Sequence, residues 1–261
     1  MKKTKPLISI IMNCHNGEKY LKKSLDSILN QTYKNWELIF WDNNSFDDSP
    51  KIVKRINDKR VHYFRGKKFV KLYKARNLAI EKASGQFICF LDTDDTWKKD
   101  FIKKHLKKIN ETNCDVVYSK YYIKNEINNR TYINEKGFLP SGKITKKLLK
   151  KYLVGINAIL LKKNIFDKLK FKSKYQVIGD FDFFLRLSLI KNFCAIQTPL
   201  LIYRHHKSNF TNKNHAILIK ELNCWIKENK KMFINKYSFN YINLRIIKLR
   251  IKDLLKKFIR V

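Results

Sequence analysis

The sequence predicts an α/β fold in which a mostly parallel sheet is covered by helices on both faces. Short apolar runs rich in β-branched residues alternate with segments whose apolar residues recur at helical spacing. The runs 7–13 and 36–41 are apolar along almost their whole length, which is typical of strands buried on both faces. Strands and helices that alternate in this order form a parallel, Rossmann-like sheet.

In the first half of the chain, expected strands alternate with expected helices. The first helix carries Leu21, Leu25 and Ile28 on one face, with lysines opposite. Ser49-Pro50 is a typical start for the second helix, because proline is tolerated in the first helical turn. The expected strands are 7–13, 36–41, 61–65 and 86–91, and the expected helices are 17–31, 49–56, 71–83 and 98–109.

The second half is predicted from weaker patterns. Asp180 and Asp182 lie in the first turn of one expected helix, where acidic side chains interact favourably with the helix dipole. Pro199 is expected to divide the apolar segment 193–206 into a pair of strands. The other expected elements are a strand at 114–123, a hairpin or polar excursion at 125–137, a helix at 143–153, a strand at 156–161 and the helix at 176–191.

The composition indicates a globular protein. With 261 residues, 44% of them hydrophobic, the chain can bury a substantial core. No apolar stretch is long enough for a transmembrane helix, and the run after the basic N-terminus is too short for a secretory signal. The five cysteines show no CxxC spacing and have apolar neighbours, so we expect reduced, buried thiols in a cytoplasmic protein and no zinc site.

The charge is strongly positive, with 57 Lys and Arg against 22 Asp and Glu and a net charge of +35. Such an excess attracts polyanions, and both nucleic acid and an anionic membrane surface fit this description. The abundance of Lys, Asn and Ile is also the bias that AT-rich coding produces without any such partner. The sequence has no Arg-rich cluster and no familiar nucleic-acid motif, so nucleic acid is not the expected partner.

Polar residues follow three of the expected strands, at 13–17, 42–45 and 92–95. Because ligands of parallel sheets bind beyond the carboxyl ends of the strands, we expect these three segments to converge on one crevice. The sequence has neither GxGxxG nor GxxxxGK[ST], so a glycine-rich loop is not expected to hold a phosphate there.

Three carboxylates, Asp92, Asp94 and Asp95, lie within four positions at the end of the fourth strand. Like charges this close repel one another, so a divalent cation or a shared proton is expected to neutralise them. All-oxygen ligands suit Mg²⁺ or Mn²⁺, and such an ion keeps open positions for substrate phosphates. The cluster therefore favours a nucleotide-linked substrate. The alternative is an acidic turn that caps the next helix.

Two long segments resemble glycosyltransferase family 2. They are ISIIMNCHNGEKYLKKSLDSILNQTYKNWELIFWDNNSFDDS, which starts at Ile8, and KARNLAIEKASGQFICFLDTDD, which ends at Asp95. The resemblance is strong over 7–110, weaker through GDFDFFLRL and YRHH to about residue 210, and does not cover the last fifty residues. It implies a GT-A fold, a nucleoside-diphosphate sugar donor, a divalent metal and inversion at the anomeric carbon.

The resemblance also implies a set of donor-binding and metal-binding residues. Asn13, His15 and Asn16 would lie beside the base or ribose, with His15 where the family often has Tyr. Asp42 would accept a hydrogen bond from the base, and Arg76 and Asn77 match the ARN signature that reaches the diphosphate. Asp92-Thr93-Asp94 matches the DXD motif. The implied metal ligands are Asp94 first, then Asp92 and Asp95, with His205 of the YRHH element as a further candidate.

The catalytic base is expected at Asp180. Family members often have Glu-Asp at this point, whereas this chain has Gly179-Asp180, so the Glu is missing and the Asp is kept. Asp182 is the reserve candidate, and Arg186, four positions later on the same helix, is placed to pair with it. Both carboxylates can also serve only as helix-terminus groups.

The expected domain organisation follows the same resemblance. Residues 1–215 would form the GT-A domain, with a nucleotide-binding half at 1–110 and an acceptor half at 111–215, and residues 216–261 a basic helical extension. A basic amphipathic helix at 241–260 could lie on an anionic inner membrane, at which the cytoplasmic protein would be peripheral, or could pack on the domain with its lysines in water.

The expected function is hexosyl transfer from a nucleoside-diphosphate sugar, most simply of the UDP type, to a hydroxyl of a saccharide or lipid-linked saccharide in cell-surface polysaccharide synthesis. A nucleotidyltransferase is an alternative that would release pyrophosphate instead of a nucleoside diphosphate. A non-catalytic polyanion-binding protein is another, and it would bind nucleic acid in a salt-sensitive way that Asp94→Ala leaves unchanged.

Overall fold

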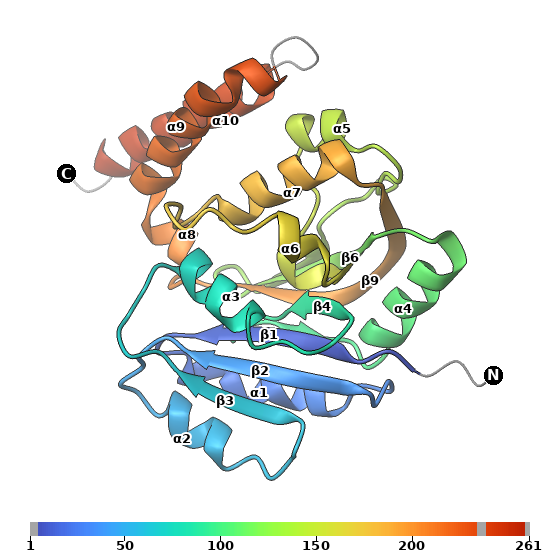
Figure 1. Ribbon diagram of the computed structural model, residues 1–261. Coiled ribbons are helices and arrows are strands. Elements are labelled where there is room, and N and C mark those ends of the chain that lie inside the picture. The colour runs from blue at the N-terminus through green and yellow to red at the C-terminus, as the bar shows by residue number, and fades with distance from the viewer. Residues whose placement is uncertain (1–4, 234–238, 259–261) are drawn as a thin grey trace.

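The computed structural model describes residues 5–233 and 239–258 and shows a curled sheet with helices on both faces (Figure 1). The first four strands pair in parallel, as the sequence predicted, and their carboxyl ends point to the same edge. The strand order is β3-β2-β1-β4-β8-β6-β9-β5, with β7 paired to β6. These strands are β1 Ile8–Cys14, β2 Trp36–Asp42, β3 Val61–Arg65, β4 Phe87–Phe90, β5 Thr96–Trp97, β6 Val116–Asn125, β7 Arg130–Ile133, β8 Ile159–Lys162 and β9 Phe193–His205.

The two faces of the sheet carry separate hydrophobic cores, because successive side chains of a strand point to opposite faces. In β1, Ile11 packs into one core, whereas Ile8, Ile10 and Met12 pack into the other. One core is completed by α1 Glu18–Leu29, α2 Ser49–Lys54 and α4 Phe101–Thr112, and the other by α3 Leu72–Ile80, α5 Thr145–Lys150, α6 Ile165–Lys168, α7 Gly179–Ile190, α9 His215–Phe233 and α10 Asn240–Phe258.

The structure corrects two of the elements predicted in the second half. Segment 193–206 is one strand, β9, and not a strand pair. Its register against β6 shifts near Pro199, and this irregularity accommodates a residue that has no N–H to donate. The predicted strand 156–161 is a 3₁₀ turn, η1 Ile156–Ala158, followed by β8.

The cysteines also differ from the expectation of reduced thiols. Cys14 and Cys89 are buried and free, but Cys114 and Cys194 form a disulfide, and Cys224 is exposed. The bonded pair lies 80 residues apart in sequence, and the pairing of β6 with β9 brings its Cα atoms to 6.2 Å. Because disulfides are rare in reducing compartments, this pair removes the support that cysteine usage gave to a cytoplasmic location.

The C-terminal helices pack on the helical layer. Trp225 of α9 is fully buried against Phe181 of α7, and burying a side chain of this size contributes about 1.5–3 kcal/mol. Within the described ranges, no helix has the length and apolarity needed to cross a bilayer. Residues 259–260 of the predicted basic helix lie outside the described residues.

Candidate active site

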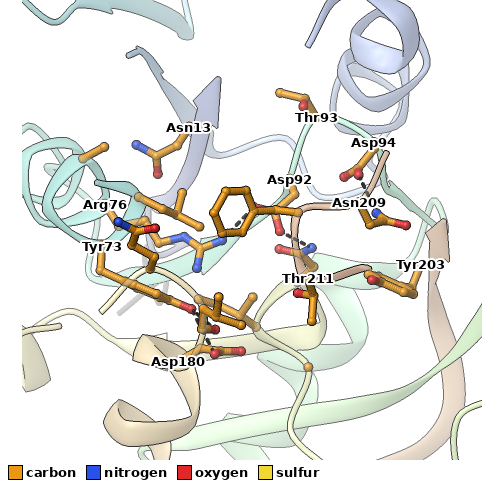
Figure 2. A pocket seen from close by; sticks show the side chains of 18 of the residues that line it. Asn13, Tyr73, Arg76, Asp92, Thr93, Asp94, Asp180, Tyr203, Asn209 and Thr211 are labelled. Carbon is orange, nitrogen blue, oxygen red and sulfur yellow. Dashed lines mark hydrogen bonds and ion pairs between the residues drawn. The ribbon is translucent and has the colours of Figure 1, made fainter. Parts of the chain in front are cut away.

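A cavity of about 700 Å³ lies beyond the carboxyl ends of the parallel strands. Asn13 contributes from β1, Arg76 from α3, Asp92 and Asp94 from the loop after β4, and Asp180 from the start of α7 (Figure 2). The remaining wall includes α8, Phe210–Lys213, which follows β9. The predicted segments 13–17 and 92–95 therefore both place candidate site residues in this cavity. From the third predicted segment, 42–45, only Asn43 lines it.

The carboxylates of Asp92 and Asp94 have different partners. Arg76 Nη2 donates to Asp92 Oδ1 at 2.7 Å, and Asn157 Nδ2 donates to Asp92 Oδ2 at 2.9 Å. His206 Nε2 lies 3.0 Å from Asp94 Oδ2. Burial and the nearby Asp92 raise the pKa of Asp94, which favours its neutral form. A cation in the cavity would have the opposite effect and favour the ionised carboxylate.

Asp95 is fully buried and does not line the cavity. Its Oδ1 accepts from the backbone N–H of Arg204 at 2.8 Å and its Oδ2 from Asn157 Nδ2 at 2.6 Å. Burial raises its pKa well above the usual range, with further increases from Asp94 and Asp92. Its contacts make Asp95 a group that holds the loop in place.

The residues around Asp94 fit a divalent cation that the substrate helps to hold. Among the described residues, no group of three or more His, Cys, Asp or Glu side chains is arranged to hold a metal. The lining nevertheless provides Asp94, with His206 beside it, and Mg²⁺ or Mn²⁺ is commonly held by one or two protein ligands and substrate phosphates. Neither His205, the candidate from sequence, nor His206 lines the cavity, but His206 contacts Asp94 from behind the lining.

Asn13 and His15 line the end of the cavity nearest β1 and β2. The Nδ2 group of Asn13 is buried and has no hydrogen-bond partner among the described residues, which is unusual and leaves a donor for a ligand. The ring of His15 lies 4.5 Å from that of Phe69, centroid to centroid. This end of the cavity therefore offers aromatic surface beside an amide donor.

Three other donor-side candidates do not line this cavity. Asp42 is fully buried, and its carboxylate accepts from Tyr63 Oη at 2.6 Å and from the Ser45 N–H at 2.8 Å. The neighbouring Asn43 lines the cavity in its place. Asn16 adopts a positive φ of 55° and accepts from the Phe46 N–H, and Asn77 binds both backbone groups of Phe171 through its amide.

Asp180 lies at the opposite end of the cavity, between two tyrosines. Its Oδ1 accepts from Tyr73 Oη at 3.0 Å and its Oδ2 from Tyr152 Oη at 3.1 Å. Burial raises the pKa of Asp180, and the positive charge of Arg76 opposes this rise. A carboxylate whose pKa is raised towards neutrality is a better general base than an exposed one.

The structure explains why glycine precedes Asp180. A Cβ atom at Gly179 would lie 2.4 Å from Cδ2 of Tyr73 and 2.5 Å from two further ring atoms. The ring of Tyr73 therefore occupies the space that a side chain at position 179 would need, where the family often has Glu. The hydroxyl of the same tyrosine binds Asp180, so the departure from the family pattern and this hydrogen bond belong together.

Gly179→Ala tests this explanation. We expect a loss of about 1–3 kcal/mol in the free energy of unfolding, as for other overpacked sites, because neither the backbone of α7 nor the ring can move freely. Displacing Tyr73 from Asp180 should also lower activity about tenfold. Thermal unfolding and sugar-nucleotide turnover measure the two effects. Gly137→Ala, where the nearest atom is a flexible carboxylate oxygen at 3.4 Å, is the control, and equal effects in both variants would contradict the explanation.

Asp182, the reserve candidate, faces away from the cavity. Its Oδ2 accepts from Arg186 at 2.6 Å, the pairing that the i,i+4 spacing indicated, and its Oδ1 accepts from Trp225 Nε1 at 3.0 Å and lies 3.2 Å from Lys172 Nζ. It is fully buried. These contacts join α7 to α9 and leave Asp180 as the carboxylate of this helix that reaches the cavity.

Helix α9 also holds the segment that leads into α7. The Glu221 carboxylate accepts from the backbone N–H groups of 176, 177 and 178 at 2.6, 2.9 and 3.1 Å. These donors precede the N-terminus of α7, where Asp180 lies. Glu221, Tyr73, Tyr152 and Asn157 were not predicted, because single residues far apart in sequence form no motif. Of these contacts, the sequence indicated only that a helix lies at α9.

The fold and the site together define a glycosyltransferase with the GT-A fold. The family described as Glycosyl transferase family 2 matches residues 9–169, more than half of the sequence. The chain belongs to this family. The fold class and the family implied by the sequence motifs are therefore confirmed.

Relatives of known or assigned function share this class. The chain is 32% identical over 205 residues to the Escherichia coli UDP-Glc:alpha-D-GlcNAc-diphosphoundecaprenol beta-1,3-glucosyltransferase WfgD, covering 77% of this chain and 78% of WfgD. It is 34% identical over 119 residues to the putative teichuronic acid biosynthesis glycosyltransferase TuaG of Bacillus subtilis, covering 45% and 47% of the two chains.

The fold is similar to that of S. aureus TarS 1-349 solved in complex with UDP-GlcNAc. The TM-score is 0.68 at 18% identity, and the match covers 83% of this chain and 65% of the TarS chain. This chain therefore spans slightly less than two thirds of that structure. At this level of identity the likeness concerns the fold.

Proposed function

We propose that the protein is an inverting, metal-dependent glycosyltransferase that moves a sugar from a UDP-sugar to a hydroxyl of a lipid-linked saccharide in cell-surface polysaccharide synthesis. One observation carries the proposal. The same cavity contains the guanidinium of Arg76, the carboxylates of Asp92 and Asp94, and the carboxylate of Asp180, which is held by two tyrosines.

The donor is assigned to the end nearest β1. The unpartnered Asn13 amide and the ring of His15 can receive a base, and Arg76 has further N–H donors besides the one that binds Asp92. A TarS structure contains UDP-GlcNAc and the name of WfgD specifies UDP-Glc, which supports a UDP-sugar. A bound divalent cation would neutralise charge on the leaving diphosphate, with Asp94 as its first protein ligand and Asp92 beside it in the cavity lining.

The acceptor is assigned to the end nearest Asp180. Tyr121 and Tyr152 line this part of the cavity and offer flat apolar surface for a sugar ring, whereas Tyr203 lies on the side of Asp94. Asp180 would take the proton of the attacking hydroxyl, while Arg76 stabilises the charge that develops on the diphosphate. Because attack comes from the side opposite the leaving group, the anomeric configuration inverts. WfgD is named for a diphosphoundecaprenol-linked acceptor, which supports a lipid-linked saccharide here.

A thermal-shift screen of UDP-, GDP- and dTDP-sugars, with and without Mn²⁺, tests the donor and the metal together. UDP-sugars with Mn²⁺ should stabilise the protein by about 2.7 kcal/mol at a ligand concentration 100 times Kd. Chelation should remove this stabilisation, and so should Asp94→Asn. The control is Asp100→Asn, at an acidic residue outside the cavity lining. Stabilisation by UDP-sugar that survives chelation would contradict the metal role, and pyrophosphate release during turnover would indicate a nucleotidyltransferase.

A further inference from the structure

We propose that the rim of the cavity is a docking surface for an anionic lipid bilayer. The rim surface consists of Lys67, Lys68 and Phe69 in the loop before α3, Leu72 at the start of α3, and Phe210 of α8. This inference rests on the proposed function, because a bilayer at the rim would present a lipid-linked saccharide at the opening of the cavity that contains Asp180.

Apolar exposure is the first observation. Phe69 is 55% exposed, Leu72 37% and Phe210 52%, although each of them lines the cavity. They come from two segments about 140 residues apart in sequence, so their meeting at one opening is a product of the fold. Because these side chains line the cavity and are each at least 37% exposed, they lie at the opening of the cavity. Their transfer into the interfacial region of a bilayer is favourable, because it removes apolar area from water.

Charge is the second observation. Lys67 and Lys68 are exposed next to Phe69, and Lys71 and Lys74 are exposed on either side of Leu72. Lysines are common over this whole chain, so positive charge alone does not select a face. Positive charge beside exposed aromatic and aliphatic side chains does select a face, because stable peripheral binding combines insertion of apolar side chains with attraction to anionic lipids.

The arrangement in space is the third observation. The loop before α3 and α8 lie at the edge of the molecule to which the carboxyl ends of β1, β2 and β3 point (Figure 1). The stripe of exposed Leu244, Ile247 and Ile251 on α10 has a similar composition, and the sequence left open whether that helix contacts a membrane or packs on the domain. The α10 stripe does not line the cavity, whereas Phe69, Leu72 and Phe210 of the rim surface do, so only the rim surface brings lipid directly to the opening.

Vesicle sedimentation tests the charged part of the rim surface. The full chain should bind vesicles of three parts phosphatidylcholine to one part phosphatidylglycerol at least about tenfold more tightly than vesicles of phosphatidylcholine alone, because only the former attract the lysines. Lys67→Glu with Lys68→Glu should lower the partition coefficient at least about tenfold, since each lysine near such a surface contributes substantially to binding. The matched control is Lys103→Glu with Lys107→Glu on α4, which makes the same change in net charge on the opposite side of the molecule (Figure 1). The control should change binding less than threefold.

The apolar part is tested in the same assay at 0.5 M salt, where attraction between charges is largely screened. Phe69→Ser with Phe210→Ser should abolish the binding that remains, whereas Leu244→Ser with Ile247→Ser on α10 should leave it. Equal losses for the α4 and rim charge variants, or loss only on changing α10, would overturn the proposal. The assay contains no sugar nucleotide, so absent vesicle binding with intact UDP-sugar binding would refute the docking surface without touching the proposed function.

Discussion

Asp180→Asn is expected to lower kcat about 10³-fold, within the range that a positioned general base contributes. The amide cannot take the proton of the attacking hydroxyl, but it can still accept hydrogen bonds from Tyr73 or Tyr152. UDP-sugar affinity should therefore change little. Steady-state turnover together with UDP binding by calorimetry separates these two quantities.

The pH dependence gives the same prediction a second readout. Because burial raises the pKa of Asp180, kcat/KM should rise with pH along a limb whose midpoint lies above 3.8, the ordinary value for Asp. In the folded state this carboxyl binds its proton more tightly, so its contribution to stability is present at low pH and is lost as pH rises through the raised pKa. Asp180→Asn has no carboxyl to ionise, so it does not lose stability in this way as pH rises. Its Tm at pH 7 should therefore equal or exceed that of the wild type.

Asp182→Asn is the matched control for the base assignment. Asp182 is buried with Arg186 and Lys172, so removing its charge leaves uncompensated positive charge and should cost about 3 kcal/mol in the free energy of unfolding. The kcat per folded molecule should stay within threefold of the wild type. The opposite pattern, with activity lost in Asp182→Asn and retained in Asp180→Asn, would transfer the role of base to Asp182.

Arg76→Met is expected to reduce both stability and activity. The Arg76 side chain is 3% exposed and the Asp92 side chain 37% exposed, so the variant leaves Asp92 without a cation in a partly buried site. We expect a loss of about 2–3 kcal/mol in the free energy of unfolding, below the value for fully buried pairs because Asp92 reaches solvent. Activity should fall about 10²–10³-fold, since the guanidinium no longer stabilises the leaving diphosphate.

A double variant separates the two effects of Arg76. Asp92→Asn in the Arg76→Met background should restore part of the stability in denaturant unfolding, because position 92 no longer carries an unpaired charge. It should not restore turnover, since the cation near the diphosphate is still missing. Recovery of turnover in the double variant would show that Arg76 acts only by neutralising Asp92.

The first half of the fold followed from the sequence because its signals are local. Apolar runs such as 7–13 and 36–41 became β1 and β2, and the periodic apolar residues of 17–31 became the buried face of α1. The structure of segment 193–206 was not predicted correctly from its local pattern. A proline in an apolar run predicts a break, and only the pairing of β6 with β9 showed that a register shift accommodates Pro199 within one strand.

The candidate site was predicted in outline and corrected in detail. Parallel strands must end at a common edge, so Asn13, Asp92 and Asp94 could be placed together from sequence order alone. The burial of Asp42 beneath Tyr63, and the choice of His206 over His205 beside Asp94, depend on which way each side chain points. Moving one residue along a strand reverses the direction in which the side chain points. The local sequence pattern does not show which of two neighbouring residues faces the cavity.

The sequence by itself determined the α/β class, the family motifs and the carboxylates that carry the proposed chemistry, because each of these is written in short stretches of adjacent residues. Only the tertiary structure decided which carboxylate of α7 enters the cavity, why residue 179 is glycine, and that Glu221 of α9 holds the start of α7. These are contacts between residues from about 40 to more than 100 positions apart, and such contacts exist only once the chain has packed.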